Sequence, residues 1–331
     1  MRRASFLVAL CAIAALGCSG APDKSPAAPL TKVRMSFSKH LSWGPLMIAQ
    51  AEGFFRDEGL DVEFVTQLRP EESLVALVTG DIDVRPGPIN AGFLSAVARQ
   101  APIRIAAGMV NLNGGSCTYY GIMLKPGFDS VNGKPHIKRM RAGQDGASRY
   151  MMTKMLAREN VRIKEIESVR LPEAVFATAL ENGSLDAVGV TEPGLSRLKT
   201  RGATLWLSAQ DAVPGFQWAV VAFGDRLLNR DRETGMRFIR AYVRGITQYR
   251  QGKTDRNVAI IADGTQETPE HIRDVCWPDF NPEGRINWES IADYEAWAKT
   301  EGLMLKIVSR EEAFDSAFVT AAARANPAGL P

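Results

Sequence analysis

The sequence predicts a two-lobed α/β protein from three observations: alternating strand and helix patterns, a length beyond one core, and an internal repeat. Of the 331 residues, the roughly 300 that follow an N-terminal signal are at the limit of a single hydrophobic core. Strand-like runs that alternate with helix-like runs indicate mostly parallel sheets. We expect residues 32–118 and 220–331 to form a discontinuous lobe I, residues 119–219 to form lobe II, and a hinge to join them.

The chain begins with the pattern of an export signal. Two arginines precede an apolar run over residues 4–17, which is shorter than the roughly 20 residues that span a bilayer. Residues 15–18, Ala-Leu-Gly-Cys, resemble a bacterial lipobox. We expect residues 1–17 to be a signal peptide and Cys18 to be lipidated, with ordinary secretion as the alternative. Residues 18–31, rich in proline and small residues, are expected to form a flexible tether.

The first lobe is expected to begin with a strand, a loop, a helix and a second strand over residues 33–65. Alternating apolar and polar residues predict the two strands, and a polar-aromatic loop, Lys39–Gly44, leaves the first strand. Ser42 is expected to cap the helix, with Pro45 in its first turn. In an open α/β sheet, the carboxyl ends of strands are where ligands bind, so this loop is the first candidate wall of a cleft. Further along are expected a helix over 70–79, a strand over 82–84, a loop over 85–90, a strand over 103–110 and a polar loop over 111–120.

An internal repeat supplies a second candidate wall. Residues 80–84, Gly-Asp-Ile-Asp-Val, are echoed by residues 183–187, Gly-Ser-Leu-Asp-Ala. Each copy follows a predicted helix that starts with Pro-Glu and precedes a proline-containing turn, 85–87 in one copy and 191–194 in the other. We therefore expect two similarly built lobes whose strand ends face each other.

The remaining segments fit this plan. In lobe II, Ser148 is expected to cap a helix with a buried methionine stripe, and the apolar residues before Gly224 are expected to form a strand that returns to lobe I. Helical patterns from Asp231 onward, interrupted by a loop over 277–286, predict a helical C-terminal part that packs on lobe I.

Charge and composition exclude several functions. Without the two signal arginines, 38 basic side chains face 37 acidic ones, a balance that gives no reason to expect nucleic-acid binding. The three histidines lie far apart and no CxxC motif is present, so no metal site and no cofactor is expected. Cys117 and Cys276 could pair outside the cytoplasm or remain separate buried thiols, and the sequence leaves both options open.

The candidate binding residues lie at predicted strand ends and helix starts. Arg85 and Arg149 suit an anion, whereas Glu192 suits an amine or a ring nitrogen. The alternatives are that Asn90 and Ser148 only cap their helices, that the arginines lie on the surface, and that Glu192 only stabilises its turn. The full candidate set is His40, Trp43, Arg85, Gly87, Asn90, Tyr119, Ser148, Arg149, Glu192 and Trp218.

Five stretches resemble the solute-binding proteins of nitrate/sulfonate/taurine-type ABC importers, a group that includes binders of thiamine pyrimidine precursors. They are residues 46–55, 58–62, 76–84, 101–105 and 192–193. The resemblance implies a type II periplasmic-binding-protein fold that closes on a small molecule and delivers it to an ABC permease. It further implies a non-enzymatic, monomeric protein that lies outside the cytoplasm, in the periplasm or at the cell surface, and that the lipid would anchor to a membrane.

One departure from that family concerns the ligand. Where its members commonly carry small residues after the Gly-Asp-Ile-Asp-Val strand, this chain has Arg85-Pro86. The ligand therefore stays open among a sulfonate, a nitrate-like anion and a pyrimidine or amine. An enzyme acting on a pyrimidine-like molecule through His40, and a sensor that has lost transport, are the alternative functions.

Overall fold

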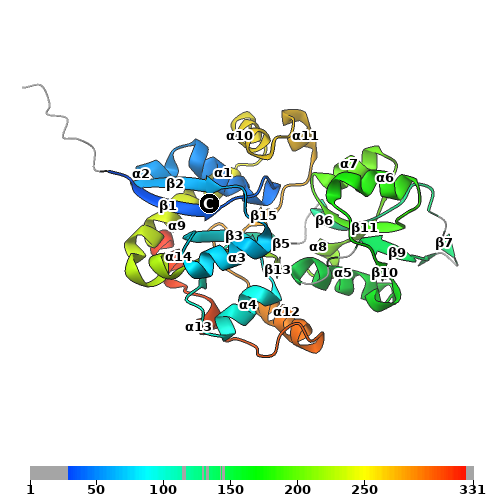
Figure 1. Ribbon diagram of the computed structural model, residues 1–331. Coiled ribbons are helices and arrows are strands. Elements are labelled where there is room, and N and C mark those ends of the chain that lie inside the picture. The colour runs from blue at the N-terminus through cyan, green and yellow to red at the C-terminus, as the bar shows by residue number, and fades with distance from the viewer. Residues whose placement is uncertain are drawn as a thin grey trace, which may run out of the picture.

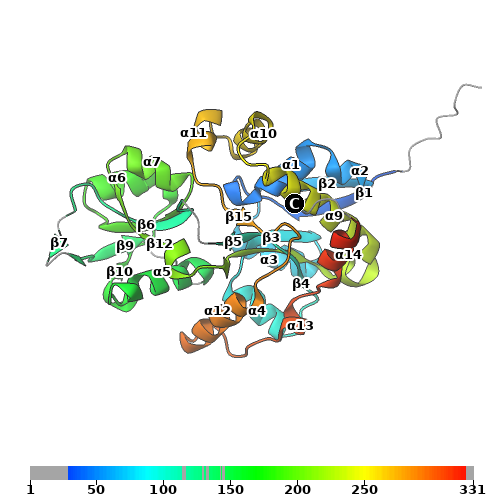
Figure 2. The same ribbon diagram turned by 180° about the vertical axis from the view of Figure 1, so that it is seen from behind.

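The computed structural model describes residues 29–113, 117–128, 130–131, 134–141, 143 and 146–325. It forms two α/β lobes side by side, each built on its own sheet (Figures 1 and 2). The predicted signal peptide and Cys18 lie outside the described residues. Of the predicted tether, Leu30 is exposed and Thr31 already belongs to the first strand. No helix in the described part of the chain is both long and apolar enough to cross a membrane.

Lobe I contains a five-stranded sheet in the order β2-β1-β3-β14-β4. Strand β14 pairs antiparallel with β3 and β4, while β1 pairs parallel with β2 and β3. The sheet is thus mostly parallel, as the sequence predicts, with one reversed strand where the chain returns from lobe II. The strands are β1 (Thr31–Ser36), β2 (Leu60–Val65), β3 (Val84–Pro88), β4 (Arg104–Gly108) and β14 (Ala219–Phe223).

Helices cover both faces of this sheet because each carries one apolar stripe (Figure 1). Gly80 ends α3 with a φ of 83°, a left-handed conformation that glycine adopts without a Cβ clash. A short 3-10 helix precedes α1, so Trp43 and not Ser42 occupies the N-cap position of α1. The elements are the 3-10 helix Leu41–Trp43 and helices α1 (Gly44–Ala51), α2 (Phe54–Asp57), α3 (Pro70–Thr79) and α4 (Ala91–Ala98).

Lobe II repeats the same sheet, in the order β10-β9-β11-β6-β12. Its reversed strand is β6, which occupies the position that β14 has in lobe I. The strands are β6 (Tyr120–Leu124), β9 (Arg139–Arg141), β10 (Glu167–Ser168), β11 (Ala187–Thr191) and β12 (Thr204–Ser208). The remaining elements are the hairpin β7 (Ser130–Val131) and β8 (Lys134–Pro135), helices α5 (Gly146–Arg158), α6 (Phe176–Glu181), α7 (Gly194–Thr200) and α8 (Ala209–Ala212), and 3-10 turns Ile163–Glu165 and Glu173–Val175.

A small sheet and a disulfide lie between the lobes. Strand β5 (Val110–Leu112) pairs with β13 (Phe216–Gln217) and β15 (Asp279–Phe280). Cys117 and Cys276 form a disulfide across a separation of 159 residues, with their Cα atoms 5.7 Å apart. Of the two options that the sequence leaves open, the structure has the bridge. It ties the chain that enters lobe II to the segment that follows α11.

The C-terminal helices pack mainly on lobe I. Helix α9 lies against α1, α2 and α14, and α14 also contacts β4. Helix α12 instead contacts α5 of lobe II, where Asp293 accepts hydrogen bonds from Tyr150 and pairs with Lys154 at 3.1 Å. The elements are a π-helical turn (Arg226–Arg230), α9 (Arg232–Tyr249), α10 (Asp255–Thr265), α11 (Pro269–Asp274), α12 (Trp288–Thr300), α13 (Arg310–Ala313) and α14 (Ala317–Ala325).

Besides the cap at Ser42, two further local expectations were wrong. The loop expected over 85–90 is largely strand, because Arg85 to Pro88 continue β3 and pair with β14. Ser148 is not an N-cap, since α5 begins two residues earlier, at Gly146. In both cases the element extends further than its local sequence indicates, because neighbouring strands and helices supply the hydrogen bonds and contacts.

Candidate ligand-binding site

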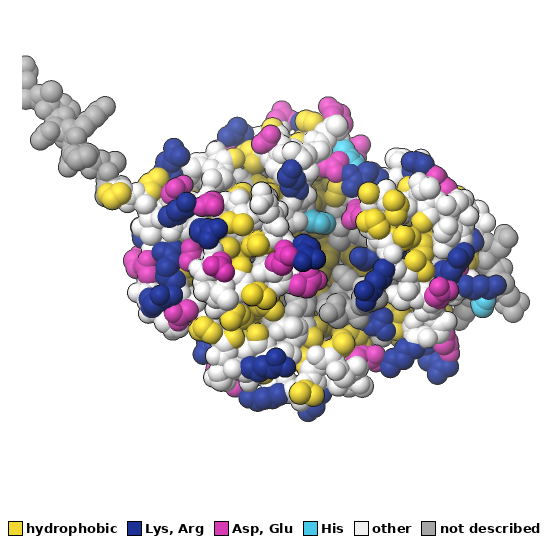
Figure 3. All heavy atoms as spheres, viewed as in Figure 1, with side chains coloured by type: hydrophobic (Ala, Val, Ile, Leu, Met, Phe, Trp, Pro, Cys, Tyr) yellow, Lys and Arg dark blue, Asp and Glu magenta, His cyan; other side chains and the backbone are white. Residues whose placement is uncertain are grey.

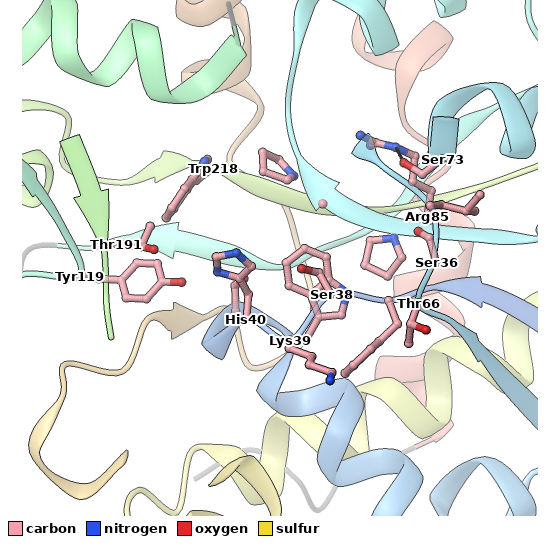
Figure 4. A pocket seen from close by; sticks show the side chains of 17 residues that line it. Ser36, Ser38, Lys39, His40, Thr66, Ser73, Arg85, Tyr119, Thr191 and Trp218 are labelled. Carbon is pink, nitrogen blue, oxygen red and sulfur yellow. Dashed lines mark hydrogen bonds between the residues drawn. The ribbon is translucent and has the colours of Figure 1, made fainter. Parts of the chain in front are cut away.

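A cavity of about 360 Å³ lies where the two lobes meet. The surface is hollowed along the line between the lobes (Figure 3), and Figure 4 shows the side chains that line the cavity. Most of the wall comes from lobe I, with Tyr119 and Thr191 contributed by lobe II and Trp218 by the segment between β13 and β14. The lining residues are Ser36, Phe37, Ser38, Lys39, His40, Ser42, Trp43, Thr66, Leu68, Ser73, Arg85, Pro86, Gly87, Pro88, Tyr119, Thr191 and Trp218.

The positions of these residues follow from the sheet topology. Strands β1 and β2 run parallel, so both carboxyl ends reach the same edge of the sheet and place Ser36 and Thr66 on the cavity. Strand β3 adds Arg85 to Pro88, and Thr191 ends β11 in the facing lobe. The strand-end rule therefore locates most of the lobe I wall.

Arg85 is a buried cation without an acidic partner. Its side chain is 3% exposed, and its Nε donates a 3.0 Å hydrogen bond to Ser73 Oγ. Across the described residues, no carboxylate lies within ion-pair distance of its guanidinium and no group accepts from its two Nη atoms. Burial lowers the pKa of Arg85 to about 10, although the charge of Glu71 acts in the opposite direction. At neutral pH the guanidinium is therefore still charged, beside Gly87 on the cavity wall.

Aromatic side chains form another part of the wall. The ring of Trp218 lies between those of Tyr119 and Tyr120, with centroids 5.4 and 5.5 Å away. Trp43 is 7% exposed and its ring centroid lies 6.2 Å from that of His40. The indole N–H groups of Trp43 and Trp218 are buried and have no hydrogen-bond partner among the described residues. These rings therefore present flat, rigid surfaces and two unused donors.

The side chain of His40 is exposed to solvent in the cleft, but nearby protein atoms partly desolvate its imidazole. Desolvation lowers the pKa of its imidazole, Glu173 raises it and Arg197 lowers it. Both of these neighbours belong to lobe II, so His40 faces across the cleft. There, Arg197 forms an ion pair with Glu267, which follows α10, and lies 3.7 Å from Glu173. At neutral pH, His40 is consequently an uncharged hydrogen-bonding group.

Glu192 does not line the cavity. Its carboxylate is 3% exposed and accepts hydrogen bonds from Ser196 N at 2.9 Å and Ser196 Oγ at 2.8 Å. A longer contact of 3.5 Å comes from Cys276 N. The carboxylate thus holds the first turn of α7 and the disulfide-linked segment, which corresponds to the turn-stabilising alternative. In this geometry the carboxylate faces Ser196 and Cys276 and not the cavity.

Three further candidates also lie outside the cavity wall. Asn90 caps α4, with its Oδ1 accepting from Phe93 N at 2.8 Å. Ser148 lies in the first turn of α5, and Arg149 Nη1 donates to Gly143 O at 3.5 Å. The remaining candidates, His40, Trp43, Arg85, Gly87, Tyr119 and Trp218, are brought together around one cavity.

The residues that sequence reasoning missed are mostly small hydroxyl side chains. Ser36, Ser38, Thr66 and Thr191 follow or end predicted strands, and Ser73 lies in the first turn of α3. The strand-end signal could have found the first four. Ser73 carries no sequence signal, because only the fold places α3 beside Arg85. The described residues contain no group of His, Cys, Asp and Glu side chains that could hold a metal ion.

Comparison with known proteins gives matches over most of the chain. The model of the NMT1-like family matches residues 26–262. A curated relative, "Putative binding protein YtlA" of Bacillus subtilis strain 168, is 19% identical over 282 residues, covering 84% of each chain.

Solved structures share the fold. The ligand-binding component of an ABC-type import system from Staphylococcus aureus, with zinc bound, has a TM-score of 0.73 and 12% identity, covering 89% of this chain and 99% of its own. The alkanesulfonate-binding protein SsuA from Xanthomonas axonopodis pv. citri, bound to MOPS, has a TM-score of 0.67 and 17% identity, covering 88% and 100%. Both likenesses concern the periplasmic-binding-protein fold, as the sequence predicts.

Proposed function

The chain belongs to the NMT1-like family, and we propose that it is an extracytoplasmic solute-binding lipoprotein that captures a small anion between its lobes and delivers it to an ABC importer. The matched structures include ligand-binding proteins of ABC importers. Binding proteins of this fold hold their solute in an interlobe cavity, which is where the 360 Å³ cavity lies.

One observation favours an anion as the ligand: Arg85 is a buried cation on the cavity wall. A buried charge is costly unless a partner of opposite sign neutralises it. Among the residues that the structure describes, the cavity wall contains the cations Arg85 and Lys39 and no acidic side chain. An anionic ligand would complete the hydrogen bonds of the guanidinium. An amine would meet no carboxylate, because Glu192 is held by Ser196.

Membrane attachment rests on the sequence. The predicted signal peptide, the lipobox-like residues 15–18 and the proline-rich tether support the proposal that a lipid anchor keeps the folded part close to a membrane-embedded permease. Metabolic labelling with a fatty acid tests this point. We expect label on the wild-type protein and none on Cys18→Ser, and an unlabelled wild type would overturn the lipoprotein proposal.

Native mass spectrometry tests the binding function. Protein purified without denaturant and without added anions should carry a small negatively charged molecule that is released unchanged on unfolding. Refolded, ligand-free protein should then be stabilised by about 2.7 kcal/mol when that molecule is present at 100 times its Kd. Release of a chemically altered product during incubation would instead support the enzyme alternative, and no binding of any small molecule would overturn the proposal.

Transport separates a binding protein from a sensor. Crosslinking in membranes should join the protein to a permease, and vesicles that contain this permease should take up the solute only when the binding protein is added. Solute binding without association with a permease would favour the sensor.

A further inference from the structure

The cavity is larger and less polar than a simple inorganic anion requires. Its volume of about 360 Å³ lies within the range of sites for organic ligands, roughly 300 to 1,000 Å³. Nitrate would meet Arg85 and leave the rest of the cavity, including its aromatic wall, without contact. The ligand must therefore carry an organic part as well as a charge.

The charged groups limit the ligand to a single negative charge at one end. Arg85 is the buried cation of the cavity wall, since Lys39 donates to Gln266 at 2.5 Å in an exposed position. Hydroxyl side chains surround the same end: Ser36, Thr66 and Ser73 lie with Arg85 on one side of the cavity (Figure 4). One guanidinium with neighbouring hydroxyls suits a carboxylate or a sulfonate. A doubly charged phosphate monoester would bring a second charge without a buried partner.

The opposite end of the cavity is aromatic. In Figure 4, Tyr119, Trp218 and His40 lie together, away from Arg85 and Ser73. Trp218 is buried and its ring packs against those of Tyr119 and Tyr120, so its position is fixed before any ligand arrives. Flat, preorganised aromatic surfaces favour a planar ring, which gains offset or edge contacts beyond its buried area.

We propose that the ligand is an aromatic monoanion: a planar ring between Trp218, Tyr119 and Trp43 that carries one carboxylate or sulfonate directed at Arg85. This inference rests on the proposed binding function and names the chemical class of its solute. The carboxylate and the sulfonate share the chemistry that the site recognises, so only the experiment separates them.

Calorimetric titration of ligand-free, refolded protein tests the ring and the charge separately. Benzoate and cyclohexanecarboxylate have the same number of carbon atoms and the same charge but differ in planarity, and benzenesulfonate replaces the head group. We expect benzoate or benzenesulfonate to bind at least 10-fold more tightly than cyclohexanecarboxylate, hexanesulfonate and phenyl phosphate. Nitrate should bind more weakly still, and benzylamine, which keeps the ring and reverses the charge, should not bind.

The variant Trp218→Leu tests the aromatic wall, with Trp206→Leu on β12 as the matched control. Trp218→Leu should remove the preference for benzoate over cyclohexanecarboxylate, whereas Trp206→Leu should keep it. Equal or tighter binding of the saturated acids by the wild type would overturn the aromatic assignment and leave the binding function standing. Binding of none of these organic anions, together with no co-purified small molecule, would defeat the binding function itself. The titrations of the wild type with these ligands test the proposal even if Trp218→Leu does not fold.

Discussion

The two lobes share the same arrangement of strands but differ at the residue two positions after the repeated aspartate. In lobe I, Asp83 accepts from the backbone N of Arg34 on β1 and pairs with Arg226 at 2.8 Å. In lobe II, Asp186 accepts from the backbone N of Arg139 on β9 and pairs with Lys125, also at 2.8 Å. The repeat in the sequence is therefore a repeat in structure, and each aspartate joins the central strand to its neighbour.

Two residues after these aspartates the lobes diverge. Arg85 in β3 pairs with Ala222 of the reversed strand, and Val188 in β11 occupies the same register position opposite Met123. Val188 is fully buried in the core of lobe II, whereas Arg85 lies on the cavity wall. The same strand position thus carries a packed apolar side chain in lobe II and a buried charge on the cavity wall in lobe I. Under the proposed function, lobe I supplies the charge that selects the solute.

Replacing Arg85 with valine, the residue at the equivalent position of lobe II, removes this difference between the lobes. Of the changes considered, it should have the largest effect on ligand binding. Arg85→Val should weaken binding of the anion by at least about 30-fold, since removal of one partner from a buried charge pair costs about 2–5 kcal/mol. Its ligand-free melting temperature should equal or exceed that of the wild type, because an unpaired buried charge is lost. Titration calorimetry and thermal unfolding measure both quantities. Arg85→Lys, which keeps the charge, should lose less affinity, and unchanged binding by Arg85→Val would refute the comparison.

The disulfide joins the chain just before Tyr119 to the segment after α11, which contacts Glu192. Replacing Cys117 and Cys276 together with alanine should lower the free energy of unfolding by about 2–4 kcal/mol, because the unfolded chain regains the freedom of a long loop. Chemical denaturation measures the change, and the reduced wild type serves as the control. Anion affinity of the folded variant should change far less than in Arg85→Val. A variant with wild-type stability would show that the bridge is not a structural support.

Glu295 of α12 is a buried carboxyl group that, unlike the two aspartates, lacks a full set of partners. Its Oε1 accepts from Val308 N at 3.2 Å, and its Oε2 has no partner among the described residues. Burial raises the pKa of the Glu295 carboxyl to about 7 from an ordinary 4.5. The folded state therefore binds the proton more tightly, and its contribution to stability is complete below pH 4.5 and lost as the pH rises to 7 and beyond.

This raised pKa predicts a measurable difference in pH dependence. Between pH 5 and pH 8 the wild type should lose up to about 3 kcal/mol of unfolding free energy through this group. Glu295→Gln should remove this contribution to the pH dependence of the unfolding free energy. It should therefore be more stable than the wild type at pH 8. Denaturation across this pH range provides the measurement, with Glu289→Gln, on the first turn of the same helix, as the control. Identical slopes for the wild type and Glu295→Gln would contradict the assignment.

The smallest expected effect tests the similarity between the lobes, namely the shared role of Asp83 and Asp186. Asp83→Asn and Asp186→Asn should each lower the unfolding free energy by about 2 kcal/mol, the scale of hydrogen bonds to a charged group. The two aspartates have equal side-chain exposure, 12%, so their losses should agree closely. Parallel denaturation curves provide the comparison. A large loss for one variant and none for the other would show that the repeat does not extend to the role of the aspartate.

The sequence predicted the architecture because the repeat and the strand periodicity are local signals. The rule that ligands bind at the carboxyl ends of strands in open α/β sheets then predicts the position of the cleft, whereas the order of the strands in each sheet was not predicted. Contacts made by distant segments were not predictable in this way. Glu192 is one example, because the distant Cys276 donates to its carboxylate. Ser196 also donates to it, and this partner lies only four residues further along the chain.

The same limitation applies to Arg85. Its sequence suggests a turn, yet pairing with β14, more than a hundred residues later, makes it part of a strand and buries it. Ser73 becomes its partner only through the packing of α3. Propensity describes each segment alone, whereas burial and partnership of a charge depend on the assembled lobes.

A crystal structure of the protein with its co-purified solute tests the central claim most directly. The account predicts an anionic group within hydrogen-bond distance of the Arg85 guanidinium, and the body of the molecule against Trp218 and Tyr119. Glu192 should keep its bonds to Ser196. A solute bound elsewhere, or one in the cavity without a negative group at Arg85, would contradict the account.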